Sequence, residues 1–538
     1  NTTAGNNAAF GQSSLAANTT GTQNTGLGSK ALQSNTTASN NTAVGYAAAQ
    51  QTTTGTNNTA LGRASLIVNT TGSDNTAVGM NSLAENTSGS SNTAVGNYAL
   101  DANTSGGSNC AFGKHSLSGN TTGSNNTGVG LHTLYSNTTG YSNTAIGAYA
   151  MEDATTAHKN TAVGLNALKD ITTGNENVAV GDNCMNSCTT GQDNTAVGEV
   201  ALGDCSTGSY NTAVGFQAGK KMFGSSYNTA FGYTAMLGNN GGIGGSNNAA
   251  FGQAALKGVS SASNVTALGA GALADLTTGS QNTAVGSAAG RFMTTASDNV
   301  LVGMDCGKQI TTGSFNVSIG KNTLSTCTTG TNNTIAGINA GLTITGSSNV
   351  ALGSNTCRGT SNNSGNNNTC VGTGALGSIA GGSENTAVGC NALNQISTAN
   401  HNVAVGQNAG QNTTTGGQNV AIGYLCLDAN TTGDLNTAVG SGAMSASTAS
   451  DRNVAVGKGA LGAYTQAGDN YIVAVGYDAG LNSTSAGQFV AVGGSALASQ
   501  TTADYNTAVG YSALASCTTG GGNTAIGRAS QYGLVSGG

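Results

Sequence analysis

One short pattern of apolar and polar residues recurs along the whole chain. A phrase of the form Asn-Thr-Ala-Val-Gly ends on a glycine, and 31 such glycines occur between Gly11 and Gly527. Of the 30 intervals between them, 26 share one 17-residue length. The four exceptions are the intervals Gly232 to Gly252, Gly337 to Gly353, Gly353 to Gly372 and Gly457 to Gly476. A fixed period of this length predicts a repeat protein in which each unit contacts its neighbours.

Positions within a unit are numbered from its glycine, which is position 0. Position −4 is Asn in 28 of the 31 units, −3 is mostly Thr and −2 is mostly Ala. Position −1 is Val, Leu, Ile or Phe in every unit except the one with Ala336, and +4 is usually Leu or Met. Three regular units supply the representative residues of these structural columns: Asn41, Thr42, Val44, Gly45, Asn75, Val78, Gly79, Leu83, Asn194, Val197, Gly198 and Leu202.

The unit is too short for two helices, and its Val, Thr and Ile residues with Gly, Asn and Ser between them predict short strands. Alternation along Asn-Thr-Ala-Val places Thr and Val on one face of the strand and Asn and Ala on the other. Glycines at position 0 and near +10 are expected to provide left-handed backbone at two corners. The predicted fold is therefore all-β: a parallel β-solenoid or β-roll of about 31 coils with a 17-residue repeat.

Stacking the coils about 4.8 Å apart turns each position into a column of like residues. We expect Val at −1 and Leu at +4 to form two inward apolar stripes, and Asn at −4 to form an amide ladder. Position +7 is expected to point inward as well. Where +4 becomes glycine, as at Gly219, position +7 becomes a large residue such as Met222.

The repeat predicts a single continuous array over residues 1–538, with irregular coils near 233–252, 338–372 and 458–476. These irregular coils include two insertions, Asn239–Ser246 and Thr360–Asn367, which we hypothesise to carry contacts. At the strand spacing, the array would be a rod roughly 150 Å long. One coil holds only two or so large apolar side chains, a thin core for a lone rod, so we expect several rods to share a core.

The phrase Asn-Thr-Ala-Val-Gly followed by Ala-Leu resembles the head repeats of trimeric autotransporter adhesins, the YadA-like β-roll. It is also similar to repeat regions of phage tail fibres and bacterial surface fibres. Matching segments include 41–45, 75–79, 143–147, 194–198 and 523–527, and the resemblance covers essentially the whole chain. It implies a left-handed roll, three chains wide, that projects from a surface and binds a target. The family's repeat is usually shorter, and residues 1–538 show no pattern of a neck, stalk or anchor segment, so we expect the architecture to carry over better than membership of that family.

Composition restricts the function classes further. Charged residues make up 7% of the chain, against about 25% in ordinary domains, and the chain has 86 Gly, no Pro and no Trp. The 15 Lys and Arg residues form no basic cluster, so no nucleic-acid partner is expected. No apolar run reaches the roughly 18 residues that a spanning helix needs, so no membrane insertion of this segment is expected. Residue 1 is Asn and no secretory signal follows it, so we expect a processed product or a piece of a longer protein.

Candidate chemical sites are few. Cys188 and Cys205 share position +7 in adjacent coils, where the Cα separation suits a disulfide, so this bridge is a possible one. Cys184 and Cys188 have no second pair of cysteines, which argues against zinc. His115 and His132 stack at +2, but two ligands rarely hold a metal. Acidic residues such as Asp74 precede the Asn phrase in some coils only, whereas a calcium column would need one in every coil.

No constellation of catalytic residues occurs in the sequence, so we expect no enzyme activity, no cofactor and no metal. We expect a structural and adhesive extracellular fibre on a cell or virion surface. Its partners would be copies of itself, three by the resemblance, and a host-surface or glycan ligand of unknown identity. The alternatives are an end-to-end filament or matrix subunit, and a monomeric ice-binding solenoid. The ice-binding alternative needs an outward Thr rank, and the alternation places Thr in phase with the Val expected to be buried.

Overall fold

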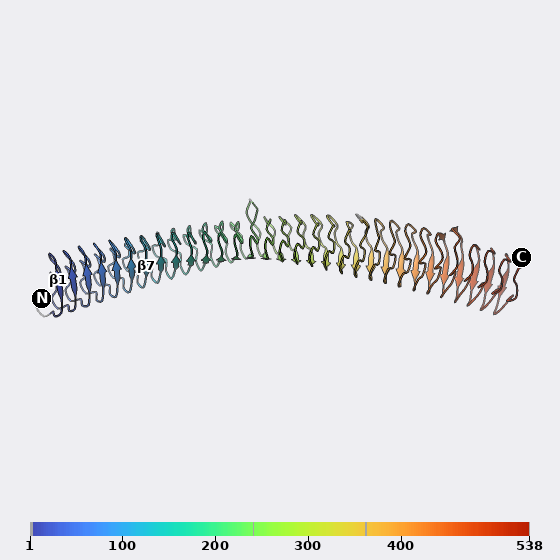
Figure 1. Cartoon of the computed structure of the whole chain (residues 1–538), viewed down its shortest axis with the longest axis horizontal. Coiled ribbons are helices and arrows are strands. Elements are labelled where there is room, and N and C mark those ends of the chain that lie inside the picture. The colour runs from blue at the N-terminus through green and yellow to red at the C-terminus, as the bar shows by residue number, and fades with distance from the viewer. Residues whose placement is uncertain (1–3, 240, 361–362, 537–538) are drawn as a thin grey trace. The chain divides into compact units, whose positions relative to one another are not determined.

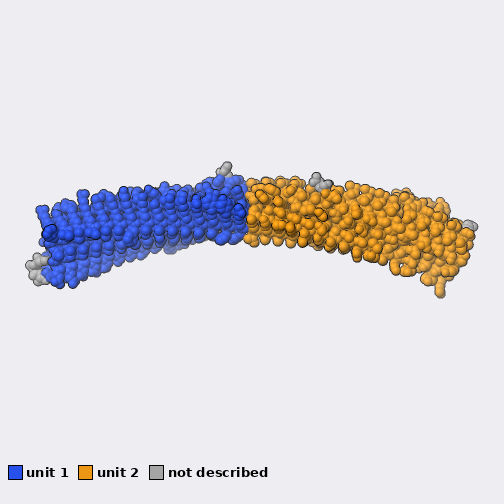
Figure 2. Space-filling model, in the orientation of Figure 1, with its two compact units in different colours: residues 1–265 blue, residues 266–538 orange. Residues whose placement is uncertain are grey.

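The protein is described by a computed structural model that covers residues 4–239, 241–360 and 363–536. It is all-β: a parallel β-solenoid of about 30 turns with a repeat of about 17 residues. This confirms the predicted fold class at that level. The chain divides into two compact units, residues 1–265 (unit 1) and 266–538 (unit 2), which Figure 2 distinguishes by colour. The expectation of one continuous array stays a prediction.

Each regular coil contributes one three-residue strand at positions −3 to −1, and the strands follow one another along the stack (Figure 1). The strands of unit 1 are β1 (Ala8–Phe10), β2 (Thr25–Leu27), β3 (Thr42–Val44), β4 (Thr59–Leu61), β5 (Thr76–Val78), β6 (Thr93–Val95), β7 (Cys110–Phe112), β8 (Thr127–Val129), β9 (Thr144–Ile146), β10 (Thr161–Val163), β11 (Val178–Val180), β12 (Thr195–Val197), β13 (Thr212–Val214), β14 (Thr229–Phe231) and β15 (Ala249–Phe251).

Unit 2 has the same organisation, with one extra pair of two-residue strands, β27 and β29, where the irregular coil at 458–476 pairs with the coil before it. Its strands are β16 (Thr266–Leu268), β17 (Thr283–Val285), β18 (Val300–Val302), β19 (Val317–Ile319), β20 (Thr334–Ala336), β21 (Val350–Leu352), β22 (Thr369–Val371), β23 (Thr386–Val388), β24 (Val403–Val405), β25 (Val420–Ile422), β26 (Thr437–Val439), β27 (Ser450–Asp451), β28 (Val454–Val456), β29 (Gly468–Asp469), β30 (Val473–Val475), β31 (Val490–Val492), β32 (Thr507–Val509) and β33 (Thr524–Ile526).

Neighbouring strands within each unit pair in parallel, and the register places like positions together. In β5 and β6, for example, Thr76 lies opposite Thr93 and Val78 lies opposite Val95. In unit 2 the same register joins Val403 of β24 to Val420 of β25. The same position of the repeat therefore lies directly above itself in each successive coil. The exposure and side-chain type typical of a position extend along the whole unit.

The interior of each coil is lined by the face of the strand that carries Asn and Ala. Asn75 at −4 and Ala77 at −2 are fully buried, as is Leu83 at +4. The prediction that Val at −1 points inward is wrong: Val197 is 39% exposed and Phe231 is 52% exposed. The predicted alternation of the two faces is present, but it is the face with Asn and Ala that points inward. Asn can be buried there because the adjacent coils pair its side-chain amide with hydrogen-bond partners.

That pairing comes from a ladder of asparagine side chains along the stack. The side-chain amide of Asn75 donates to the Gly89 carbonyl at 2.9 Å and to Asn58 Oδ1 at 3.1 Å. The Asn75 backbone N–H also donates to Asn58 Oδ1, at 3.0 Å. A buried polar side chain is tolerated when its donors and acceptors are paired, and here the adjacent coils supply the partners.

The corners differ from the prediction at one of the two glycine columns. Gly79 at position 0 has a positive φ of 131°, as expected for a left-handed corner. Gly72 at +10 does not have a positive φ, and a Cβ there would meet the Gly89 carbonyl oxygen and Asn69 Oδ1. Alanine also occupies this column, as at Ala38. The other left-handed residues of the coil are not glycine: Asp74, Asn81 and Leu83 have φ of 61°, 55° and 53°.

A small residue at one inward position of a coil is compensated by a large residue at another. Met222 at +7 is fully buried, and its Cε lies 2.9 Å from where a Cβ of Gly219 would be. A second exchange was not anticipated. Leu301 at −2 stands where most coils have Ala, and it fills the space beside Gly307 at +4, whose Cβ would lie 2.9 Å from it. The volume of the coil interior is thus conserved while its individual side chains vary.

Candidate functional site

The outward side of the strands is a candidate interaction surface. We call the side chains at positions −3 and −1 of the strands in each unit its strand face. They include some of the most exposed large apolar residues of the described chain, among them Phe10 at 76%, Phe231 at 52% and Leu61 at 46% in unit 1, and Leu268 and Ile319, both at 47%, in unit 2. An extended apolar surface of this kind marks a site of interaction.

The strand face carries no charged residue in any of the 31 repeats. Exposed sheet surfaces normally carry charges that prevent association. In unit 1, position −3 is Thr in 11 of the 15 strands. In unit 2, leaving out β27 and β29, it is Thr in 8 of 16 strands and Val in the other 8. The strand face of unit 1 is therefore richer in hydroxyl groups and that of unit 2 is more apolar.

The representative residues predicted from the sequence are distributed over both sides of the coil. The asparagines and leucines among them are buried, namely Asn41, Asn75, Asn194, Leu83 and Leu202. Thr42 and Val197 are exposed on the strand face, and Val44 and Val78 are half-buried there. The structure thus assigns the inward residues to packing and leaves Thr and Val available for contacts.

The cysteines predicted to pair are both buried in neighbouring coils. Cys188 and Cys205 are free thiols in the structure, and its disulfide joins Cys357 at +4 to Cys370 at −2. A hydrogen bond between the Cys188 and Cys205 thiols, together with burial, raises the pKa of Cys188. The sequence missed the other pair because those two residues occupy different columns and meet only across the coil interior.

The two stacked histidines belong to an aromatic cluster in unit 1. The rings of Tyr98 and His115 stack with centroids 5.2 Å apart, and His132 lies edge-on to His115 at the same distance. His132 Nδ1 lies 3.5 Å from Glu152 Oε1. Burial, followed by the positive charges of His132 and Lys114, lowers the pKa of His115. No three metal-ligating side chains converge within the described part of the chain.

The acidic residues before the Asn phrase make separate local contacts. Asp74 Oδ1 accepts a hydrogen bond from Asn57 Nδ2 at 3.0 Å. Glu176 pairs with Lys159 at 2.7 Å, and that hydrogen bond lowers the pKa of the Glu176 carboxyl. In unit 2, Glu384 pairs with His401 at 2.8 Å. Asp74, Glu176 and Glu384 thus pair with three different side chains in separate coils, so these three residues do not form a shared site.

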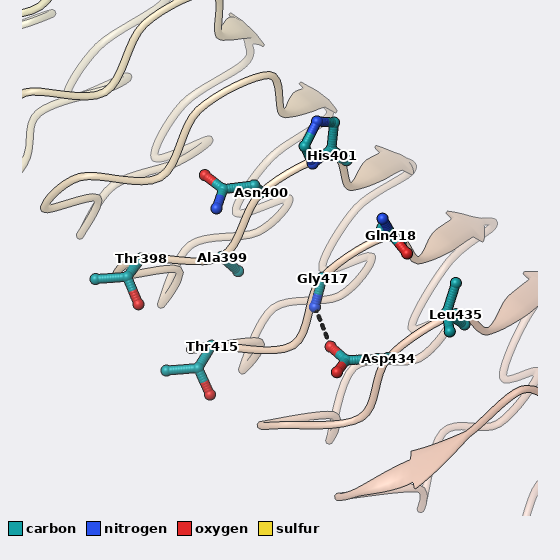
Figure 3. Close-up of a pocket in the computed structure, with 9 residues that line it drawn as sticks. All are labelled: Thr398, Ala399, Asn400, His401, Thr415, Gly417, Gln418, Asp434 and Leu435. Atoms are coloured by element: carbon teal, nitrogen blue, oxygen red, sulfur yellow. Dashed lines mark hydrogen bonds between the residues drawn. The ribbon is translucent and has the colours of Figure 1, made fainter. Parts of the chain in front are cut away.

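An open groove lies at a corner of unit 2, over Gly417 (Figure 3). Asn400 and Asp434 lie on either side of Gly417 along the stack, and Thr398 and Thr415 lie on one flank. The backbone N–H of Gly417 donates to Asp434 Oδ1 at 2.5 Å. The sequence offered no sign of this groove other than a glycine in a column that usually carries a polar side chain.

The insertions hypothesised to carry contacts are described only in part. Asn240 lies outside the described residues, as do Ser361 and Asn362. Near the first insertion, the Ile243 backbone N–H donates to the Lys221 carbonyl at 2.9 Å, and Ile243 is buried. No helix among the described residues is long and apolar enough to span a membrane.

Comparisons with known proteins give no assignment. No protein-family model matches the chain, and no curated protein matches it.

Proposed function

We propose that this chain is a segment of a structural and adhesive extracellular fibre, in which three copies associate through their strand faces. The observation that carries the proposal is the absence of charge from the strand face in all 31 repeats, together with its exposed apolar side chains. Charged residues keep a surface that stays in water from associating with other chains. On a surface buried between copies, the same charges would oppose association.

A second copy is the partner that matches this surface best. The strand face repeats once per coil, about every 4.8 Å, and another copy presents the same period. A strand of three residues is about 10 Å wide, so the 15 strands of unit 1 offer about 700 Å². That approaches the area of about 800 Å² that each partner contributes to a stable interface. The resemblance to adhesin head repeats supports the number three and the left-handed coil.

The ladders inside each unit would make such a fibre stiff. The asparagine ladder and the parallel backbone pairing join each coil to the next. A second ladder runs at position +8, where Thr70 Oγ1 donates to the Thr87 carbonyl at 2.9 Å. Bending a unit would strain many hydrogen bonds at once. A stiff spacer of this kind would hold a binding surface away from a cell or virion and so mediate attachment.

Light scattering of the native particle tests the assembly. We expect a mass of three times 52.0 kDa. The matched variant places lysine at three outward positions of unit 1: Val78→Lys, Val95→Lys and Val129→Lys. Because buried, unpaired charges are costly, it should dissociate to single chains while its circular dichroism stays that of a β-solenoid.

The control places lysine at three exposed positions of column +9, Thr54, Thr71 and Thr122, and should remain associated. A native mass of one chain would contradict the proposed assembly. A lysine-bearing strand face that still associates would show that copies meet through another surface.

Ice binding is a second candidate that the structure favours more than the sequence did. Thr at −3 points outward, beside the apolar residue at −1, as with Thr42 and Val44 of β3. Unit 1 therefore presents hydroxyl and methyl groups in regular rows. Thermal hysteresis of the purified protein measures this activity. A hysteresis gap that the Val→Lys variant abolishes would support ice binding, and freezing at the ordinary melting point would exclude it.

A further inference from the structure

The groove over Gly417 arises from a gap in a ladder that runs along one corner of the coils. At position −6, a side-chain oxygen accepts the backbone N–H of the same position in the preceding coil. The Ser73 N–H donates to Ser90 Oγ in this way, and the Gly107 N–H donates to Ser124 Oγ, both at 3.1 Å. Gly417 occupies this position without a side chain, and so leaves a hollow between Asn400 and Asp434.

The two ends of the hollow present opposite hydrogen-bonding capacity. Asp434 Oδ1 is occupied by the Gly417 N–H, and Oδ2 has no protein partner among the described residues. Asn400 Oδ1 accepts the Ser383 N–H at 2.7 Å, and its Nδ2 donor has no partner among the described residues. The hollow therefore offers a charged acceptor at one end and an amide donor at the other.

The flanks complete the lining with hydroxyl groups on one side and mixed groups on the other. Figure 3 shows Thr398 and Thr415 on one flank, and His401, Gln418 and Leu435 on the other. Both threonines and Gln418 are exposed to solvent, and Leu435 is 43% exposed, which adds an apolar wall. Ligand sites commonly combine a concave shape, a few placed polar groups and an apolar surface.

We propose that this groove binds one pyranose residue of an uncharged glycan. A sugar hydroxyl both donates and accepts, so hydroxyls on opposite sides of the ring can donate to Asp434 Oδ2 and accept from Asn400 Nδ2, two side chains that stand two coils, about 10 Å, apart. An anionic ligand would be repelled by Asp434 and by the nearby Glu384. A metal ion is disfavoured, because no group of three His, Cys, Asp or Glu side chains surrounds a point in the described chain.

The inference rests on the proposed adhesive function, because it names the class of ligand that the fibre would hold. It does not depend on the number of associated copies. The groove is formed by residues of unit 2 alone, and all of them lie outside the strand face.

Saturation-transfer difference NMR on the intact chain tests the groove. The probes are the methyl glycosides of glucose, galactose, mannose and N-acetylglucosamine, each in excess, with sialic acid as an anionic probe. We expect a transfer signal for at least one uncharged glycoside and none for sialic acid. Two variants should reduce that signal at least fivefold.

The first variant, Gly417→Asn, fills the hollow with the side chain that the preceding coil carries. Gly417 is not left-handed, and its Cβ would lie 3.1 Å from the Asn400 carbonyl oxygen. Gly107→Asn is the matched control, since a Cβ there would lie 3.1 Å from the Ser90 carbonyl oxygen. The control introduces the same side chain at the same position in unit 1 and should leave the signal unchanged.

The second variant, Asp434→Asn, removes the charge but keeps an oxygen that can accept the Gly417 N–H. Asp451→Asn is its control, because Asp451 Oδ1 accepts the Asp434 N–H at 2.7 Å in the same ladder, at a coil where no side chain is missing. Absence of signal from every uncharged glycoside would overturn the inference, as would a signal that both groove variants retain. Loss of binding with a trimeric mass would refute the groove alone. A single-chain mass with binding intact would refute the strand-face assembly alone.

Discussion

Asn75 Oδ1 accepts two hydrogen bonds from Asn92 in the next coil, from its backbone N–H at 3.0 Å and from its side-chain amide at 3.2 Å. Both residues are fully buried. The same relationship recurs along most of each unit, for example between Asn368 and Asn385 of unit 2. An amide column is thus the polar half of the interior, and each member depends on the coil above and the coil below.

Replacing Asn75 with Ala should destabilise unit 1 strongly. The change leaves the buried Asn92 backbone N–H without its acceptor, and a buried unpaired group costs about 1–3 kcal/mol. The Gly89 carbonyl keeps its hydrogen bond from Asn86 Nδ2. Guanidinium unfolding followed by circular dichroism measures the loss. Asn81→Ala is the control, because Asn81 lies at +2, where Ala47 has nearly the same left-handed φ of 57°. Equal unfolding midpoints for the two variants would refute a structural role for the ladder.

The inward placement of position −2 predicts that Ala162→Leu destabilises the coil by about 1–3 kcal/mol, because it overfills a packed interior. The double variant Ala162→Leu with Leu168→Gly should recover most of that loss. With Ile171 already at +7, it reproduces the arrangement of Leu301, Gly307 and Ile310. Thermal unfolding of the single and double variants provides the measurement. A double variant no more stable than the single one would argue against the exchange of volume.

Thiol reactivity should separate buried from exposed cysteines. Burial raises the pKa of Cys184 and that of Cys426 to about 12, so about one in 10⁴ of either is thiolate at pH 8. Cys390 is free and exposed. We expect iodoacetamide to label Cys390 first in the native chain, as read by peptide mass spectrometry, and Cys390→Ser to abolish that fast phase. Rapid native labelling of Cys184 would contradict the burial of its column.

The aromatic cluster predicts a pH dependence of stability. The pKa of His115 is lowered in the folded chain, chiefly by burial, so the unfolded chain binds this proton more readily. The free energy of unfolding is therefore not reduced by His115 above pH 6.5, the ordinary pKa of histidine. It falls as the pH drops below that value. In the variant His115→Gln, the denaturation midpoint should depend less on pH between pH 5 and 7 than it does in the native chain. An unchanged pH profile in this variant would exclude His115 as the source.

The sequence by itself determined the period, the number of repeats and the parallel stacking, because a strict 17-residue spacing leaves few ways to superpose like residues. It also predicted the exchange between Gly219 and Met222, since both changes lie in one unit. It did not find the groove over Gly417, whose walls come from three successive coils.

Only the tertiary structure decided which face of the strand lies inside. Alternation along the strand places Asn75 and Ala77 on one face and Thr76 and Val78 on the other. Hydrophobicity alone predicts that the face with Val78 is the inward one. Burying Asn75 requires partners that exist only when coils stack, namely Asn58 Oδ1 and the Gly89 carbonyl. Those hydrogen bonds offset the desolvation of the amide, and the small Ala77 lets the coil close tightly. The threonine and valine columns are left on the outside, where the proposed contacts would form.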